Sequence, residues 1–289
     1  MVVVDKPGGW TSHQVVGRVR RLAGTRKVGH AGTLDPMATG VLVVGVERAT
    51  RLLGHLTLTT KEYRATIRLG ISTVTDDAEG ETTDSVGAGW VTPAHVAEQL
   101  SAFRGVIEQV PSSVSAIKVQ GVRSYARVRA GEDVALASRS VTVSRLDLLE
   151  VRETQVEALP VVDVDVDVEC SSGTYIRALA RDLGAALGVG GHLTALRRTR
   201  VGPFALVEAQ TLDAAADGLM TVGIAEVARR CFPTVVLTDE QAERVTHGRR
   251  LPQLALPAPT TALMTRSGEF LALYRPEDGD AVAISVFTA

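Results

Sequence analysis

The spacing of apolar residues near the start of the chain predicts an amphipathic helix over residues 11–22. Thr11 is followed three residues later by Gln14, the pairing of a capping box, so we expect the helix to begin there. Apolar side chains then recur at helical spacing on one face, namely Val15, Val16, Val19 and Leu22. Arg18 and Arg21 fall on another face, which predicts a basic surface beside the buried stripe.

Two further helices follow from the same kind of pattern. Thr92 and Pro93 supply an N-cap and a first-turn proline for a helix expected to end near Gly105. Its buried stripe would consist of Val96, Leu100 and Phe103. Gly173 marks a turn before the other helix, whose first turn carries Arg177. The buried side of that helix would be Ile176, Leu179, Ala180 and Leu183.

Strands are indicated where the apolar period changes to two or becomes continuous. Residues 41–46 form a short apolar run, as in a buried strand, and residues 63–69 alternate. In residues 162–169 valine alternates with acidic residues, which predicts one buried and one solvated face. Strands and helices do not alternate regularly, so we predict an α+β fold: a mainly antiparallel mixed sheet with flanking helices.

The pattern changes near Phe232 and suggests a separate terminal unit. A short apolar run precedes a second capping box at Thr238 and Gln241, and further short apolar runs are divided by prolines and Gly268. We therefore predict a large domain over residues 1–232 and a small β-rich domain over residues 233–289. A domain of about 57 residues is near the lower limit for independent folding, so it should pack against the larger one.

Composition excludes several classes of protein. Hydrophobic residues make up 45% and charged residues 22% of the chain, as in an ordinary globular protein rather than a disordered one. No apolar run approaches the ~18 residues needed to span a bilayer. The two cysteines, Cys170 and Cys231, form no CxxC pair, which argues against a zinc knuckle or a disulfide framework. We expect a cytoplasmic protein without a membrane segment.

The net charge of −2 conceals a strong segregation of charge. Residues 10–34 contain five basic residues and no acidic ones, and residues 112–131 contain four and none. Residues 177–200 hold five basic residues and one acid, whereas residues 147–169 hold eight acids and one arginine. The distribution is compatible with a nucleic-acid-binding face, although arginines on solvated helices would give the same counts.

The candidate chemistry centres on the glycine-rich segment GHAGTLDPMATG, which contains Asp35 before a proline. Alone, this pattern is typical of a turn. No GxxxxGK[ST] or GxGxxG motif is present, so a nucleotide-dependent phosphotransferase lacks its signature. The histidines form no HExxH motif, which would indicate a metal site. Asp163, Asp165 and Asp167 alternate on a strand and should face water, so we do not expect a metal site there.

Five segments, however, occur together in one order: DKPGGWTSHQVV, VGHAGTLDPMATGVLVVGV, ATRLL, KEYRATIRLG and CSSGTYIRALARDLG. With them the chain resembles the TruB-type tRNA pseudouridine synthases across most of residues 3–202. The resemblance implies the pseudouridine synthase fold and a PUA-like RNA-binding domain at residues 233–289. It implies isomerisation of uridine 55 in the T loop of tRNA, by an aspartate nucleophile acting on a flipped base.

The resemblance also carries residue roles. Asp35 matches the family's catalytic nucleophile, Arg177 the arginine that pairs with it, and Tyr63 the tyrosine that stacks on the target base. The matches to substrate-binding positions are His30, Tyr175, Leu196 and, with no definite role, Lys6. An insertion at about 112–137 matches the segment that grips the tRNA arm. Its expected RNA contacts are Lys118, Arg123, Arg127 and Arg129.

We expect no cofactor: isomerisation transfers no electrons to an acceptor, and the missing motifs argue against a nucleotide or a metal. The expected partner is the T stem-loop of tRNA, bound by a monomer. The chief alternative is an RNA-binding or RNA-folding protein that opens the tRNA elbow without chemistry. The intact set of Asp35, Tyr63 and Arg177 favours the enzyme.

Overall fold

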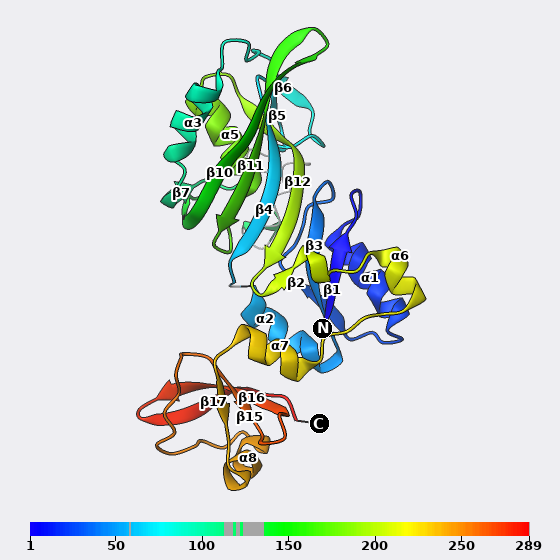
Figure 1. Ribbon diagram of the computed structural model, residues 1–289, viewed down its shortest axis with the longest axis vertical. Helices are drawn as coiled ribbons and strands as arrows, with labels where there is room; N and C mark the ends of the chain where they lie inside the picture. Colours follow the sequence, from blue (N-terminus) through cyan, green and yellow to red (C-terminus); the bar gives the residue numbers. More distant parts are fainter. Residues whose placement is uncertain (58, 113–117, 120–121, 124–135, 289) are drawn as a thin grey trace.

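A computed structural model describes residues 1–57, 59–112, 118–119, 122–123 and 136–288. Its main body is a mixed sheet whose principal strands run in the order β1-β3-β12-β4-β11-β10-β7 (Figure 1). These strands are β1 (Val2–Lys6), β3 (Thr39–Val46), β4 (Lys61–Leu69), β7 (Gly105–Gln109), β10 (Arg139–Val156), β11 (Leu159–Cys170) and β12 (Gly191–Val201). All neighbours pair antiparallel except β3 and β12, which are parallel. The prediction of an α+β fold with a mainly antiparallel mixed sheet is confirmed.

Two short strands extend this sheet and two short hairpins lie outside it. β2 (Val28–Ala31) pairs with β3, and β13 (Phe204–Ala205) pairs with β12. The hairpins are β5 (Ser72–Thr73) with β6 (Thr82–Asp84), and β8 (Lys118–Val119) with β9 (Val122–Arg123). β2 takes the first residues of the segment that the sequence analysis treated as a loop.

Two helices of the main body begin at the capping boxes that the sequence predicts. The main body has α1 (Ser12–Leu22), α2 (Leu53–Leu56), α3 (Pro93–Ser101), α5 (Ile176–Ala186), α6 (Leu212–Asp217) and α7 (Ile224–Cys231), with 3-10 turns η1 (Glu47–Leu52) and η2 (Leu206–Glu208). Thr11 and Thr92 both cap their helices in complete capping boxes. The expected end of α3 near Gly105 is wrong: the helix stops at Ser101, and Gly105 opens β7. None of the described helices could cross a membrane.

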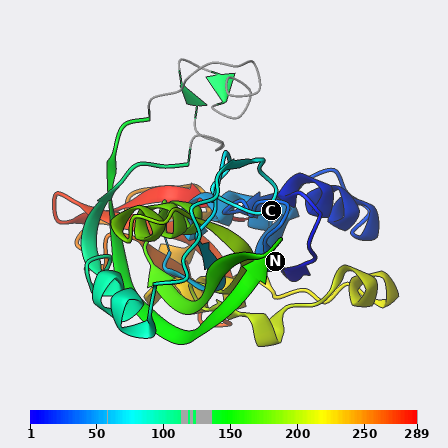
Figure 2. The same cartoon turned by 90° about the horizontal axis from the view of Figure 1, so that it is seen from above.

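The two faces of the sheet differ as the alternating pattern of residues 162–169 predicted. Helices α3 and α5 cover one face of the sheet (Figure 2). The even-numbered valines of β11 are buried there, in one cluster with apolar residues of β4 and of both helices. The acids of β11 lie on the other face, where arginines of neighbouring strands neutralise them. Asp163 pairs with Arg68 at 2.7 Å, Asp167 pairs with Arg145 at 2.5 Å, and Asp165 pairs with Arg152.

The C-terminal residues form a second, four-stranded sheet at one end of the long axis of the molecule (Figure 1). Its elements are β14 (Thr234–Val236), α8 (Asp239–Thr246), β15 (Thr261–Met264), β16 (Phe270–Glu277) and β17 (Asp280–Val286). One buried cluster joins Val43 and Leu52 of the main body with Phe270 and Phe287 of this part. The small β-rich unit therefore packs on the larger one, as expected; the boundary at residue 232 stays a prediction.

Candidate active site

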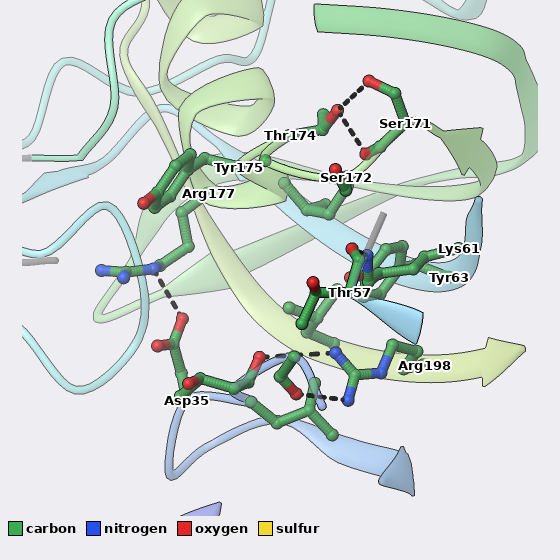
Figure 3. A pocket seen from close by; sticks show the side chains of 16 residues that line it. Asp35, Thr57, Lys61, Tyr63, Ser171, Ser172, Thr174, Tyr175, Arg177 and Arg198 are labelled. Carbon is green, nitrogen blue, oxygen red and sulfur yellow. Dashed lines mark hydrogen bonds and ion pairs between the residues drawn. The ribbon is translucent and has the colours of Figure 1, made fainter. Parts of the chain in front are cut away.

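A cavity of about 400 Å³ opens where the glycine-rich loop, β4, β12 and the start of α5 meet (Figure 3). A volume of this order suits a small organic ligand. The loop lies between β2 and β3, and the start of α5 follows directly on the turn that ends β11. Of the residues singled out from the sequence, it is lined by Asp35, Tyr63, Tyr175, Arg177 and Leu196.

Asp35 and Arg177 face one another at one side of this cavity (Figure 3). Arg177 Nε lies 2.9 Å from Asp35 Oδ2. The Arg177 side chain is 6% exposed, whereas that of Asp35 is 36% exposed. The guanidinium thus fixes the carboxylate from the protein side, while the carboxylate remains open to a ligand. A reachable anion in one orientation is suited to act as a nucleophile.

Arg177 is itself held by a segment that the sequence analysis did not single out. Its Nη1 donates to Thr75 O at 2.7 Å and lies 3.4 Å from Asp77 Oδ2. Asp77 is buried, and its Oδ1 accepts hydrogen bonds from the Thr75 hydroxyl at 2.5 Å and from Glu79 N at 3.1 Å. Arg177 therefore lies between two carboxylates, one buried and one facing the cavity.

The loop that carries Asp35 is fixed on both sides of the aspartate. After it, buried Lys6 donates to Pro36 O at 3.1 Å, to Pro7 O at 2.9 Å and to Trp10 O at 2.6 Å. Before it, Ser12 Oγ donates to Leu34 O and accepts from Leu34 N. Burial lowers the pKa of Lys6 from 10.5 to about 8. Each contact restrains the backbone, so Asp35 has little freedom to leave Arg177.

Arg198 of β12 restrains the start of the same loop. It is 1% exposed, and its guanidinium donates to Val41 O at 2.7 Å, Gly32 O at 2.9 Å and Thr33 O at 3.4 Å. β3 passes so close here that a Cβ on Gly40 would lie 2.2 Å from Arg198 O. Gly40 also has a φ of +99°, so glycine is required where these parallel strands meet.

The other side of the cavity combines the buried ring of Tyr63 with the Lys61 ammonium (Figure 3). Lys61 Nζ donates to Thr57 O at 3.1 Å and Thr59 O at 3.2 Å. Burial, helped by the nearby charge of Arg198, lowers the pKa of Lys61 to about 8. Burial also raises the pKa of Tyr63, while Arg198 opposes that effect. The result is an aromatic surface beside buried positive charges.

Tyr175 and Leu196 complete the apolar part of the lining. Tyr175 precedes α5, and the side chain of buried Gln109 fixes its backbone by accepting from Tyr175 N at 2.8 Å and donating to Tyr175 O at 3.0 Å. Arg139 lies 5.6 Å from the centre of its ring. Leu196 projects from β12 on the same side as Arg198, two residues along the strand. Apolar and aromatic side chains of this kind can line the pocket of a planar ligand.

The remaining expected site residues are placed differently. Lys6 contacts the backbone and does not line the cavity, so its role in substrate binding stays a prediction. His30 belongs to β2 outside the lining; its Nδ1 is buried without a hydrogen-bond partner among the described residues. Arg127 and Arg129 lie outside the described residues, and for Lys118 and Arg123 the structure describes a backbone pairing between β8 and β9.

Sequence reasoning missed the site residues Lys61, Asp77 and Arg198. A signal for Arg198 was available, because period two places it on the same strand face as Leu196, where a charge is unexpected. Lys61 and Tyr63 share a face of β4 for the same reason. Asp77 follows another aspartate in a loop, and its sequence neighbourhood contains no comparable signal.

The fold and this cavity define an α+β enzyme with a carboxylate–guanidinium pair beside an aromatic pocket. Protein-family models match most of the chain. The N-terminal domain of the TruB family pseudouridylate synthases matches residues 20–176. The C-terminal domain of tRNA pseudouridylate synthase B matches residues 177–228, and the C-terminal domain of tRNA pseudouridine synthase II matches residues 232–288.

Whole-chain relatives agree with these matches. A protein of Cutibacterium acnes named tRNA pseudouridine synthase B is 58% identical over 99% of this chain and 97% of its own length. A protein of the same name from Arthrobacter is 56% identical over 99% of this chain and 96% of its own length. Among solved structures, an H/ACA RNP bound to a substrate RNA containing 2′-deoxyuridine has a TM-score of 0.72 at 27% identity. That match covers 100% of this chain and 84% of the other.

The chain belongs to the TruB family of pseudouridylate synthases, and the resemblance inferred from its five sequence segments is confirmed. It is an isomerase, as expected from those segments. A chain in the crystal structure of a Cbf5-Nop10-Gar1 complex shares the fold, with a TM-score of 0.72 at 29% identity. This match covers 99% of the present chain and 84% of the other.

Proposed function

We propose that this enzyme converts uridine 55 in the T loop of tRNA to pseudouridine, with Asp35 as nucleophile. The observation that carries the proposal is the convergence of Asp35, Arg177 and Tyr63 on one cavity, although these residues come from three separate elements. The relatives from Cutibacterium acnes and Arthrobacter are named as tRNA pseudouridine synthases, which supports tRNA as the substrate.

The reaction requires the N1–C1′ bond of the uridine to break and a C5–C1′ bond to form. C5 loses a proton and N1 gains one, so the reaction balances without a co-reactant. Asp35 attacks the nucleoside or shields the developing positive charge of the sugar, and Arg177 holds it in position. Tyr63 lies beneath the base and assists proton removal from C5. The uracil must leave its stack to reach this cavity, so the enzyme flips the base.

The remaining parts of the proposal concern the partner and its setting. His30 contacts the nucleotides next to the flipped uridine, and the segment 112–137 grips the tRNA arm through Lys118, Arg123, Arg127 and Arg129. Both cysteines are free, which suits a reducing cytoplasm. We propose that the enzyme acts there as a monomer on the T stem-loop.

Asp35→Asn tests the assignment, because asparagine keeps the shape of the side chain without its negative charge. We expect tritium release from 5-³H-uridine in an unmodified tRNA transcript to fall to background, while tRNA affinity stays within about threefold. Asp84→Asn, at an exposed position on β6, is the matched control and should retain full activity. If wild type binds tRNA but never modifies it, the RNA-folding alternative replaces the synthase.

A further inference from the structure

A second hollow lies on the surface of α1, outside the active-site cavity. This groove, here the α1 groove, has a volume of about 340 Å³ and is lined by Trp10, His13, Gln14, Gly17 and Arg21. The lining residues of the helix recur at spacings of three and four, so they form one face of it. Trp10 is 36% exposed, and an indole on an open surface offers an apolar plane to a ligand.

Gly17 lines this groove, and the packing of the helix does not explain why this residue is a glycine. A glycine inside a helix costs ~1 kcal/mol relative to alanine. Helical glycines are usually explained by close approach of another segment, but a Cβ on Gly17 would meet no atom within 4 Å among its neighbours. The missing side chain instead leaves open space on this face of the helix, which a ligand in the groove can occupy.

The cations around the groove are available to an anionic partner. Arg18, Arg21, Arg26 and Lys27 form no ion pair within the described ranges. By contrast, the basic residues of 177–200 are largely engaged: Arg181 pairs with Asp182, and Arg197 pairs with Asp5. Residues 10–34 contain no acid that could neutralise them locally. Unpaired arginines beside an exposed aromatic ring are the combination that binds a single nucleic-acid strand.

The groove is also joined to the catalytic loop by direct contacts. Lys6 Nζ binds both Trp10 O and Pro36 O, the carbonyl next to Asp35. Gly9 N donates to the same Pro36 O at 2.9 Å. At the other end of the turn, Ser12 binds both backbone groups of Leu34. The turn that carries Trp10 and the loop that carries Asp35 are therefore held together by Lys6 and Ser12.

We propose that the α1 groove binds the RNA strand adjoining the target uridine, with a base stacked on Trp10 and a phosphate held by Arg21. This inference rests on the proposed RNA substrate. Gly17 lets the stacked nucleotide approach the helix. The groove thus contributes to affinity and to choice of RNA, while the chemical step takes place at Asp35.

The chain has two tryptophans, which makes the contact directly observable. Trp90→Phe leaves Trp10 as the sole indole, and Trp10→Phe leaves Trp90, which is exposed on another element beside His95. We expect saturating unmodified tRNA to quench the fluorescence of the Trp90→Phe protein strongly and that of the Trp10→Phe protein little. Equal or absent quenching of both proteins would overturn the proposal.

Gly17→Leu fills the groove with a residue that favours helix, so the fold should be retained. We expect its KM for tRNA to rise roughly tenfold, the loss of about one stacked base, with kcat unchanged. Arg21→Ala should lower the salt slope of binding by about one unit. An active Gly17→Leu enzyme with the wild-type KM contradicts this inference alone, whereas a wild type that never modifies tRNA contradicts the proposed function.

Discussion

At the scale of single residues, the site depends on buried cations that form no ion pair among the described residues. Lys6, Lys61 and Arg198 are each buried, and each binds backbone carbonyls rather than a carboxylate in the described structure. Burying a charge is costly unless it is hydrogen-bonded. Their positive field would favour a polyanionic substrate, and their contacts fix the loop that carries Asp35.

The buried charge of Lys61 gives a testable pH dependence. Its pKa falls from 10.5 to about 8 on folding, so between these pH values the unfolded chain binds more protons than the folded one. The free energy of unfolding therefore rises with pH across this window on account of Lys61. Lys61→Met removes the titration, and the stability difference, wild type minus variant, should increase by up to roughly 3 kcal/mol between pH 8 and 10.5.

Urea unfolding of both proteins at several pH values measures this difference. Lys6 contributes in the same direction, and Cys170 and Cys231, whose pKa values burial raises to about 11, contribute in the opposite one. Lys6 and Cys231 are common to both proteins and cancel in the comparison, whereas the charge of Lys61 acts on Cys170, so both proteins carry Cys170→Ala. A difference that stays constant from pH 8 to 10.5 would show that Lys61 is not desolvated.

At the scale of elements, the helices and several strands could be predicted because their signals are local. A capping box and an apolar stripe located α1 within one residue, and a second capping box marked the start of α8. β10 was missed because register shifts after Val143 and after Leu148 interrupt its period of two. Buried positions on it are therefore separated by two residues in some places and by three in others, which hides a strand of 18 residues.

The site was less predictable than these elements. Asp35 and Arg177 are far apart in the sequence, and their pairing depends on how β12 joins β3 in parallel and places α5 over the loop. Local patterns carry no information about that crossing, so the pairing came from family resemblance. Arg198 shows this limit in part: period two places it on the strand face of Leu196, but its burial depends on carbonyls from another part of the chain.

The contact between α5 and β12 supplies a prediction at this scale. A Cβ on Gly184 would lie 2.2 Å from Gly190 C and 2.3 Å from Gly191 N, and backbone atoms cannot move aside as a flexible side chain can. We expect Gly184→Ala to lower the free energy of unfolding by about 1–3 kcal/mol. Since α5 carries Arg177, kcat should fall as well.

Gly17→Ala is the matched control for that substitution, since it adds the same methyl group to a helix with open space around it. We expect it to raise the free energy of unfolding by roughly 0.5–1 kcal/mol. Chemical denaturation of both variants gives the two signs. Equal effects of the two substitutions would mean that helix propensity, not the close approach of α5 to β12, determines the result.

At the scale of the whole molecule, the distribution of ion pairs explains why net charge is a poor guide to the partner. The aspartates of β11 form ion pairs with arginines of β4 and β10, so their negative charges are compensated locally. The basic residues around α1 lack such partners in the described chain. A protein with a net charge of −2 can therefore present a basic surface next to its active site.

The packing between the two parts of the chain determines how they unfold. Phe270 and Phe287 pack with ring centres 4.8 Å apart in a cluster that also contains Val43 and Leu52 of the main body. Arg48 and Arg51 donate to Phe287 O and Val286 O, which ties the last strand to the same region. A shared core and these bonds make independent unfolding of the C-terminal part unfavourable.

Phe270→Ala should therefore destabilise the entire chain by roughly 3–5 kcal/mol, because it opens a cavity in the shared core. Calorimetry should show a single transition at a lower temperature, and hydrogen exchange should accelerate in β1 and β3 as well as in β16. Val236→Ala, at an exposed position on β14, should leave both measurements unchanged. Two separate transitions, with only the C-terminal one shifted, would show that the small sheet folds by itself and that the shared cluster contributes little to stability.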